Sequence, residues 1–169
     1  TLEKRVLSKL NEIKDTEHDK YLDFWGNWGA VVKEGLCEYS SNHEEILKTC
    51  LFFSIKHNKM ISIDEYIADV NLNLKEGEEQ KETDKKIYYL IGDRDNKEYL
   101  SKSSHIEALI AEGKDVLIMM DEVDSFWTTV VNQYKGFDFT SATQASQFSS
   151  KIESENNELC KYFESVLAK

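Results

Sequence analysis

Two short apolar runs mark the centre of the chain, Ile87–Ile91 and Val116–Met120, and both predict β-strands. Between them an amphipathic segment begins at Ser104 and stops at Gly113, which is the pattern of an α-helix. A strand, helix, strand unit of this length usually pairs its strands in parallel through a right-handed crossover. Because α/β sheets usually place function at the carboxyl end of such strands, residues 121–127 are the first candidates for a site.

The first fifty residues have helical periodicity instead. One apolar series predicts a helix over residues 2–14, and a second predicts a longer helix from Glu17 to Lys33. The stripe of this second helix has intervals of four, three and four and comprises Tyr21, Trp25, Trp28 and Val32. We expect both tryptophans of the stripe to lie in the core and the two helices to form a hairpin.

The pattern as a whole predicts an α/β fold in two linked parts. Residues 1–50 form a helical hairpin or small helical bundle, and residues 51–140 form a small three-layer α/β subdomain with a short, mostly parallel sheet. Residues 71–86 are almost entirely polar and predict a solvated loop. A polar stretch and a last amphipathic segment make residues 141–169 a linker and terminal helix.

Composition narrows the class of protein. The net charge of -11 argues against nucleic acids and anionic membrane surfaces as partners, because phosphate contacts need a basic face. No apolar run is long enough to predict a membrane span. Three widely spaced cysteines make no disulfide framework and predict a reducing, cytoplasmic location. Without an initiator Met or a signal pattern, we expect a piece of a longer protein.

An acidic turn follows the second predicted strand and has two interpretations. Asp121, Glu122 and Asp124 could bind a divalent cation, which would suit a small stand-alone α/β enzyme. Alternatively, Asp121 caps the next helix and the acidic side chains complement the helix dipole. We favour the second interpretation, because acidic residues are common at helix starts.

Two aromatic residues, Phe126 and Trp127, are adjacent on the helix predicted after this turn. Neighbouring helical positions point about 100° apart, so we expect one ring to pack inward and the other to be partly exposed. An exposed aromatic ring is a reasonable binding feature.

The remaining candidates for chemistry are weaker. The Cys/His set comprises Cys37, His43, Cys50 and His57. It lacks the short knuckles of zinc sites, and Cys50 falls on an apolar helix face, so no metal site is expected. A Cys–His nucleophile pair stays open, because such residues meet in space rather than in sequence. The Gly92–Asp95 turn could hold an anion, although a plain turn is favoured.

Four segments together resemble the heat-shock protein 90 family. Leu22–Leu36 resembles the family's F-W-x-N-F-G-x-x-L-K-E-G stretch, and Ser62–Ile67 resembles S-L-x-E-Y-V. Ile87–Asp93 is similar to I-Y-Y-I-T-G-E/D, and Val116–Trp127 resembles V-L-x-L-T-D-P-V/I-D with its acidic and aromatic continuation. The segments keep the family's order and cover nearly the whole chain. Phe126–Trp127 and Ser141–Gln144 look most like the bacterial form. Glu122 stands where the family has proline.

The resemblance implies a fragment of an ATP-dependent chaperone of the stress response. It places the chain at the C-terminal part of the middle segment, before the dimerisation domain and after the nucleotide-binding domain. This piece is then expected to be no enzyme and to hold no cofactor, whereas the full-length protein binds ATP and Mg and forms a homodimer. The expected partners are partly folded client proteins and the protein's own N-terminal ATPase and C-terminal dimerisation domains. The fragment alone is expected to be monomeric.

The resemblance also implies a set of client-binding residues. In the bacterial form an acidic residue, an aromatic residue and a polar residue one turn on contribute to client contact. By position these are Ser125, Phe126 and Thr129, and Trp127 is included as the second candidate aromatic. Ser125 departs from the family's acidic residue.

Overall fold

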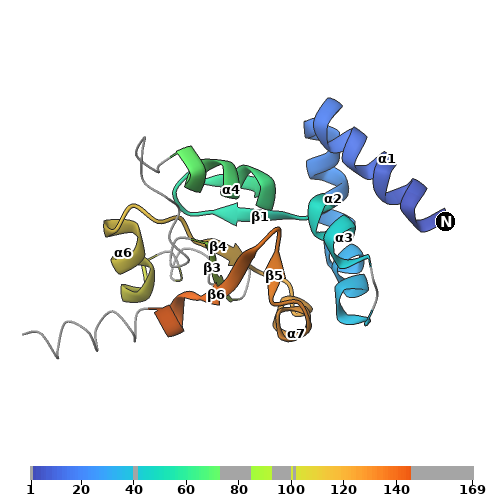
Figure 1. Ribbon diagram of the computed structural model, residues 1–169. Coiled ribbons are helices and arrows are strands. Elements are labelled where there is room, and N and C mark those ends of the chain that lie inside the picture. Colours follow the sequence, from blue (N-terminus) through green and yellow to red (C-terminus); the bar gives the residue numbers. More distant parts are fainter. Residues whose placement is uncertain (1, 40–41, 73–84, 93–99, 101, 146–169) are drawn as a thin grey trace, which may run out of the picture.

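The computed structural model describes residues 2–39, 42–72, 85–92, 100 and 102–145, and in it helices cover both faces of one sheet (Figure 1). The N-terminal part is helical, with α1 (Leu2–Thr16) and α2 (His18–Glu34) packed against each other as a hairpin. A short 3-10 helix, η1 (Gly35–Cys37), continues from α2, and α3 (His43–Thr49) packs on α1. None of the described helices is long and apolar enough to cross a membrane.

Six strands form one sheet within the described residues. They are β1 (Leu51–Ser54), β2 (Lys59–Ser62), β3 (Lys86–Ile91), β4 (Leu117–Met119), β5 (Gln133–Tyr134) and β6 (Phe137–Ser141). Their order across the sheet is β2-β1-β4-β3-β6-β5. The predicted strand, helix, strand unit is confirmed, because β3 and β4 pair in parallel with Leu90 opposite Ile118, and α6 (Ser104–Ala111) connects them.

The sheet is mixed rather than mostly parallel. Only the pairings of β3 with β4 and with β6 are parallel, whereas β1 pairs antiparallel with β2 and β4, and β5 with β6. The antiparallel edges follow from short connections, since two strands joined by a few residues can only return antiparallel. Asn58 and Lys135, both with positive φ, lie in these two tight turns.

Alternating side chains build a separate core on each face of the sheet. One face is covered by α2, α3, α4 (Ile63–Leu72) and α7 (Asp124–Val130), and the other by α6. The first core includes Phe52, Ile87 and Leu117, and the second includes Phe53, Tyr88, Ile118 and Ile106. This period-two alternation gives the predicted three layers.

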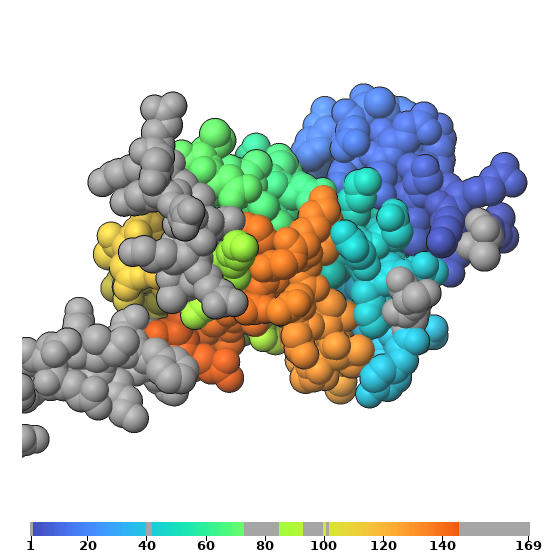
Figure 2. All heavy atoms as spheres, in the orientation of Figure 1, coloured from blue at the N-terminus to red at the C-terminus, as the bar shows by residue number. Residues whose placement is uncertain are grey.

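The core on the first face extends without interruption into the helical hairpin. Leu7 and Trp25 of the hairpin belong to the same buried cluster as Phe52 and Trp127. Figure 2 shows the cyan end of the helical part directly against the orange segment that carries α7. The division of the chain at residue 50 stays a prediction, and most of residues 71–86 and 141–169 lies outside the described ranges.

The buried face of α2 differs from the predicted stripe. The residues at strict four-residue spacing are buried, namely Tyr21, Trp25, Gly29 and Lys33. Trp28, expected in the core, is instead 57% exposed, because it lies on the flank of this face. Gly29 allows the arrangement, since a Cβ at this position would lie 2.9 Å from the Trp25 ring.

Two glycines of α2 are therefore expected to respond in opposite directions to alanine. Gly26→Ala places its methyl group in open space and should raise the free energy of unfolding by about 1 kcal/mol through helix propensity. Gly29→Ala gains the same propensity but forces the stacked Trp25 ring to move, and overpacking costs about 1–3 kcal/mol. Urea unfolding midpoints of the two variants measure the difference. Equal midpoints would contradict the close packing at Gly29.

Candidate functional site

The short helix α7 stands at the carboxyl end of β4, where the sequence places its candidate site. After Met120 the chain turns through residues 121–123, with the Asp124 N–H donating to the Asp121 carbonyl at 2.9 Å. The helix then presents two different faces. Asp124 and Trp127 are fully buried, whereas Ser125, Phe126 and Thr129 are exposed.

Trp127 is a core residue. Its Nε1 donates to Asp124 Oδ1 at 2.7 Å, and its ring centroid lies 6.1 Å from that of Phe52 and 5.3 Å from that of Phe139. Phe126, one position earlier, is 65% exposed. The expectation that one ring packs inward and its neighbour stays exposed is confirmed. Trp127, the second candidate aromatic for client binding, is completely buried, so its side chain offers no surface for contact.

The hydroxyl groups beside Phe126 are bonded to the helix itself. Ser125 Oγ donates to the Glu122 carbonyl at 2.7 Å, and Thr129 Oγ1 donates to the Phe126 carbonyl at 2.6 Å. Each hydroxyl group therefore donates its hydrogen to a backbone carbonyl, and the lone pairs of its oxygen remain available as acceptors. The exposed surface of α7 combines one apolar ring with hydrogen-bond acceptors.

A buried ionic cluster fixes α7 against α2. Lys33 Nζ donates to Asp121 Oδ2 at 2.9 Å and to Asp124 Oδ1 and Oδ2 at 2.8 and 3.0 Å. The side chains of Lys33, Asp121 and Asp124 are 3%, 13% and 0% exposed, so water screens these charges weakly. The Lys33 ammonium also lies 4.8 Å from the centroid of Phe52 on β1. One side chain thus connects α2, α7 and the sheet.

The cluster corrects the expectation that Asp121 caps the helix. The Asp121 carboxylate points to Lys33, and the Asp121 N–H donates to Asp124 Oδ2 at 3.0 Å. The side chain that organises the turn is therefore Asp124. The cation-binding interpretation also loses support, because the Lys33 ammonium lies where a divalent cation would bridge the two carboxylates.

Neither cysteine of the Cys/His set is an activated thiol. Burial raises the pKa of the Cys50 thiol to about 12, so the thiol stays protonated at neutral pH, which argues against a role as nucleophile. Burial, with Glu34 and Asp124 nearby, also raises the pKa of Cys37. In the part of the chain that the structure describes, no three His, Cys, Asp or Glu side chains are placed to hold a metal ion.

The predicted anion turn is described only at its first residue. The Gly92 N–H donates to the Met119 carbonyl at 2.9 Å, so this amide is used by the sheet. A Cβ at Gly92 would lie 1.9 Å from Leu100 Cδ1, which explains the glycine by close packing. Residues 93–95 lie outside the described ranges.

Lys33 is a site residue that no motif in the sequence indicates. Its partners are 88 and 91 positions away in the chain, beyond any local pattern. A signal was present in the spacing, because Lys33 continues the four-residue series of Tyr21, Trp25 and Gly29 on α2. A lysine at a core position implies a buried acidic partner.

Comparison with known proteins agrees with the fold and the motifs. The model of the family described as Hsp90 protein matches residues 1–168. The chaperone protein HtpG of Rickettsia canadensis is 46% identical over 142 residues, which cover 84% of this chain and 21% of that protein. HtpG of Rickettsia bellii is 41% identical over 178 residues, covering 97% of this chain and 27% of the relative.

A solved structure of a heat shock protein also resembles this chain. The middle domain of a Plasmodium falciparum heat shock protein superposes with a TM-score of 0.65 at 32% sequence identity, covering 82% of this chain and 53% of that one. The chain belongs to the Hsp90 family of chaperones and corresponds to part of the middle domain. The bacterial HtpG proteins are relatives at 41–46% identity, which confirms the resemblance to the bacterial form. The chain spans only 21–27% of their length.

Proposed function

We propose that this chain is the spacer and client-contact part of an ATP-dependent chaperone, with Phe126 at the centre of the contact. The observation that carries the proposal is the division of α7 into a buried and an exposed face. A 65% exposed phenylalanine lies on the helix that follows β4, and the other aromatic residue of that helix is fully buried. The contact set is then Ser125, Phe126 and Thr129.

The spacer role is supported by how firmly α7 is connected to the rest of the chain. A continuous core extends from Leu7 in the hairpin to Trp127 in α7, and Lys33 adds a buried ionic connection between α2 and α7. A unit packed in this way moves as one body when another domain pulls on it. In the proposal, ATP and Mg bind to a nucleotide-binding domain elsewhere in the homodimeric full-length protein, and this chain transmits the motion.

The client-contact role is supported by the modest chemistry of the exposed face. One ring and two hydroxyl oxygens offer apolar area and acceptors without a shaped recess, so they select weakly among partly folded proteins. Contact area without exact fit gives moderate affinity that many sequences can share.

Phe126→Ala in the full-length protein is expected to weaken binding of an unfolded client by about 1–2 kcal/mol, a factor of roughly 5 to 30 in Kd. The reason is loss of the aromatic anchor of the contact. Fluorescence anisotropy of a labelled, permanently unfolded client measures the affinity. The matched control is Leu72→Ala, which removes another large apolar side chain, 83% exposed, from a different helix.

The two variants separate a site from general surface stickiness. Selective loss at Phe126 supports the proposal, and equal losses at both positions show that exposed apolar residues bind clients without a defined site. Unchanged affinity in both variants would leave this chain as an interaction module without a client surface of its own.

A further inference from the structure

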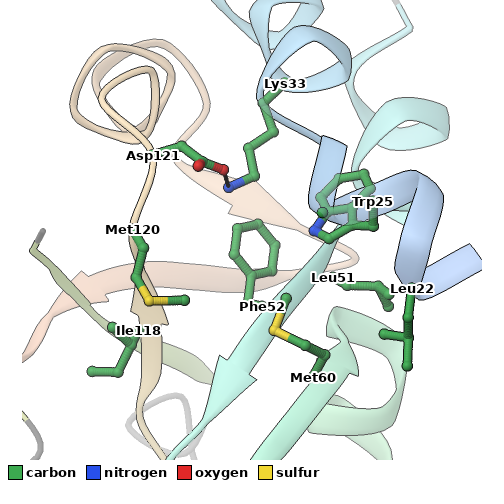
Figure 3. A pocket seen from close by; sticks show the side chains of 10 residues that line it. Leu22, Trp25, Lys33, Leu51, Phe52, Met60, Ile118, Met120 and Asp121 are labelled. Atoms are coloured by element: carbon green, nitrogen blue, oxygen red, sulfur yellow. Dashed lines mark hydrogen bonds and ion pairs between the residues drawn. The ribbon is translucent and has the colours of Figure 1, made fainter. Parts of the chain in front are cut away.

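A half-open cavity of about 300 Å³ lies between α2 and the sheet, beside the Lys33–Asp121 ion pair (Figure 3). Its walls come from α2, β1, β2 and the end of β4. The lining residues are Leu22, Trp25, Gly26, Lys33, Leu51, Phe52, Met60, Ile118, Met120 and Asp121. This volume is at the lower end of the range for small-molecule sites, and the mostly apolar lining is typical of them.

The indole N–H of Trp25 is a hydrogen-bond donor that faces this cavity. Trp25 is 5% exposed, and Figure 3 shows its ring nitrogen directed toward Phe52 and the cavity. Its described interactions are the stacking on Tyr21 and the approach of Lys33 to its ring, and Nε1 donates to no residue within the described ranges. By contrast, Trp127 Nε1 is bonded to Asp124 at 2.7 Å. Trp25 Nε1 is open to the cavity rather than buried without a partner, so a ligand that carries an acceptor can replace water at this donor.

The charges of the cavity favour an uncharged ligand. Lys33 and Asp121 are the charged lining residues, and they are paired with each other at 2.9 Å. A charged ligand would lose its hydration at this end of the cavity without gaining a counter-charge that is not already paired. The ligand that fits this site is therefore uncharged and carries one hydrogen-bond acceptor.

The remaining walls can adapt to a flat ring. Met60 and Met120 face each other across the cavity, and thioether side chains are flexible and make favourable contacts with aromatic groups. Phe52 adds an aromatic wall between them. Gly26 leaves the side of α2 open, because a Cβ there would meet no atom within 4 Å.

We propose that this cavity is a binding site for a small neutral aromatic molecule with one hydrogen-bond acceptor, which accepts from Trp25 Nε1. The proposal goes beyond the client contact at Phe126 and does not depend on it. The cavity is too small for a segment of several residues, which is why the ligand is a small molecule rather than a client chain.

Acetophenone, an aromatic ring with a single carbonyl acceptor, is a suitable probe. Titrated into the ¹⁵N-labelled 169-residue chain, it should saturate a shift of the Trp25 indole N–H resonance toward the hydrogen-bonded range. The indole resonances of Trp28, which is exposed, and of Trp127, which is bonded to Asp124, should stay in place and serve as internal controls.

Two substitutions test the cavity and the donor separately. Gly26→Met fills the open side and should weaken acetophenone binding at least about tenfold, whereas Gly26→Ala should leave it within about twofold. Trp25→Phe keeps an aromatic wall but removes the donor, and should weaken binding about 5- to 10-fold, the effect of one hydrogen bond. The Met60 and Met120 methyl resonances report binding in these variants, and thermal unfolding confirms that each variant is folded.

The outcomes decide the proposal. Saturable binding that Gly26→Met abolishes and Trp25→Phe weakens supports it. The proposal is overturned if acetophenone moves the Trp28 resonance instead of the Trp25 resonance, or if Gly26→Met leaves the affinity unchanged. It is also overturned if Trp25 shows no saturable shift. If Trp25→Phe is poorly folded, Gly26→Met and the wild-type Trp25 resonance still decide the result.

Discussion

Replacing Lys33 with methionine is expected to lower the free energy of unfolding by about 3–5 kcal/mol, the range for breaking a buried ion pair by removal of one partner. Methionine keeps most of the aliphatic stem but removes the ammonium that binds both Asp121 and Asp124. The fully buried Asp124 carboxylate then loses its counter-charge and faces a second carboxylate nearby. Urea unfolding followed by tryptophan fluorescence measures the loss.

The matched control is Lys20→Met, which removes a lysine from the same helix. Lys20 pairs with Glu17 at 3.0 Å, but the two side chains are 69% and 51% exposed, so we expect less than about 1 kcal/mol. A similarly small effect at Lys33 would contradict the buried cluster. In the double variant Lys33→Met, Asp124→Asn the loss should be smaller than the sum of the single losses, because the asparagine removes the charge at the fully buried position and only the Asp121 carboxylate still lacks Lys33.

The parts of the fold that were predictable are those with local causes. The strand, helix, strand unit follows from two apolar runs and the helical pattern between them, and the structure confirms its parallel pairing. The capping box before α4 is equally local. The Ser62 N–H donates to Glu65 at 2.7 Å, and the Glu65 N–H donates to Ser62 Oγ at 3.2 Å, as the spacing of the two residues indicates.

The sheet edges were less predictable, because strand partners are chosen by tertiary packing. β2 has only four residues, and its burial rises from exposed Lys59 to buried Ser62, so it has no clear alternation to mark it as a strand. Its pairing with β1 depends on the turn at Asn58, whose φ of 51° is uncommon for a residue other than glycine. An edge strand that forms because it pairs with its neighbour need not have a strand pattern in its own sequence.

The candidate site shows the same limit at the level of side chains. The sequence predicts that Phe126 and Trp127 are adjacent on a helix and lie in different environments. It does not predict which of the two rings faces inward. That choice depends on Asp124, which accepts from the Trp127 indole, and on Lys33, which neutralises Asp124 from another helix. The orientation of α7 is thus set by an interaction between residues 91 positions apart, and this orientation leaves Phe126 exposed.

Trp127→Ala is accordingly expected to destabilise the chain strongly, by about 3–5 kcal/mol, as truncation of a buried aromatic residue does. The substitution removes the ring contacts with Phe52 and Phe139 and leaves the Asp124 carboxylate without its indole donor. Phe126→Ala, at the adjacent and exposed position, should change the free energy of unfolding by no more than about 0.5 kcal/mol. Urea titrations of both variants, with the slopes compared to confirm two-state unfolding, measure the contrast.

This contrast tests the assignment of the two faces of α7. A large loss of stability for Phe126→Ala would place its ring in the core and remove the basis for a contact surface there. A small loss for Trp127→Ala would mean that α7 is held by the ionic cluster alone. With the expected pair of values, any loss of client binding in Phe126→Ala reports on the surface itself, because the fold beneath it is unchanged.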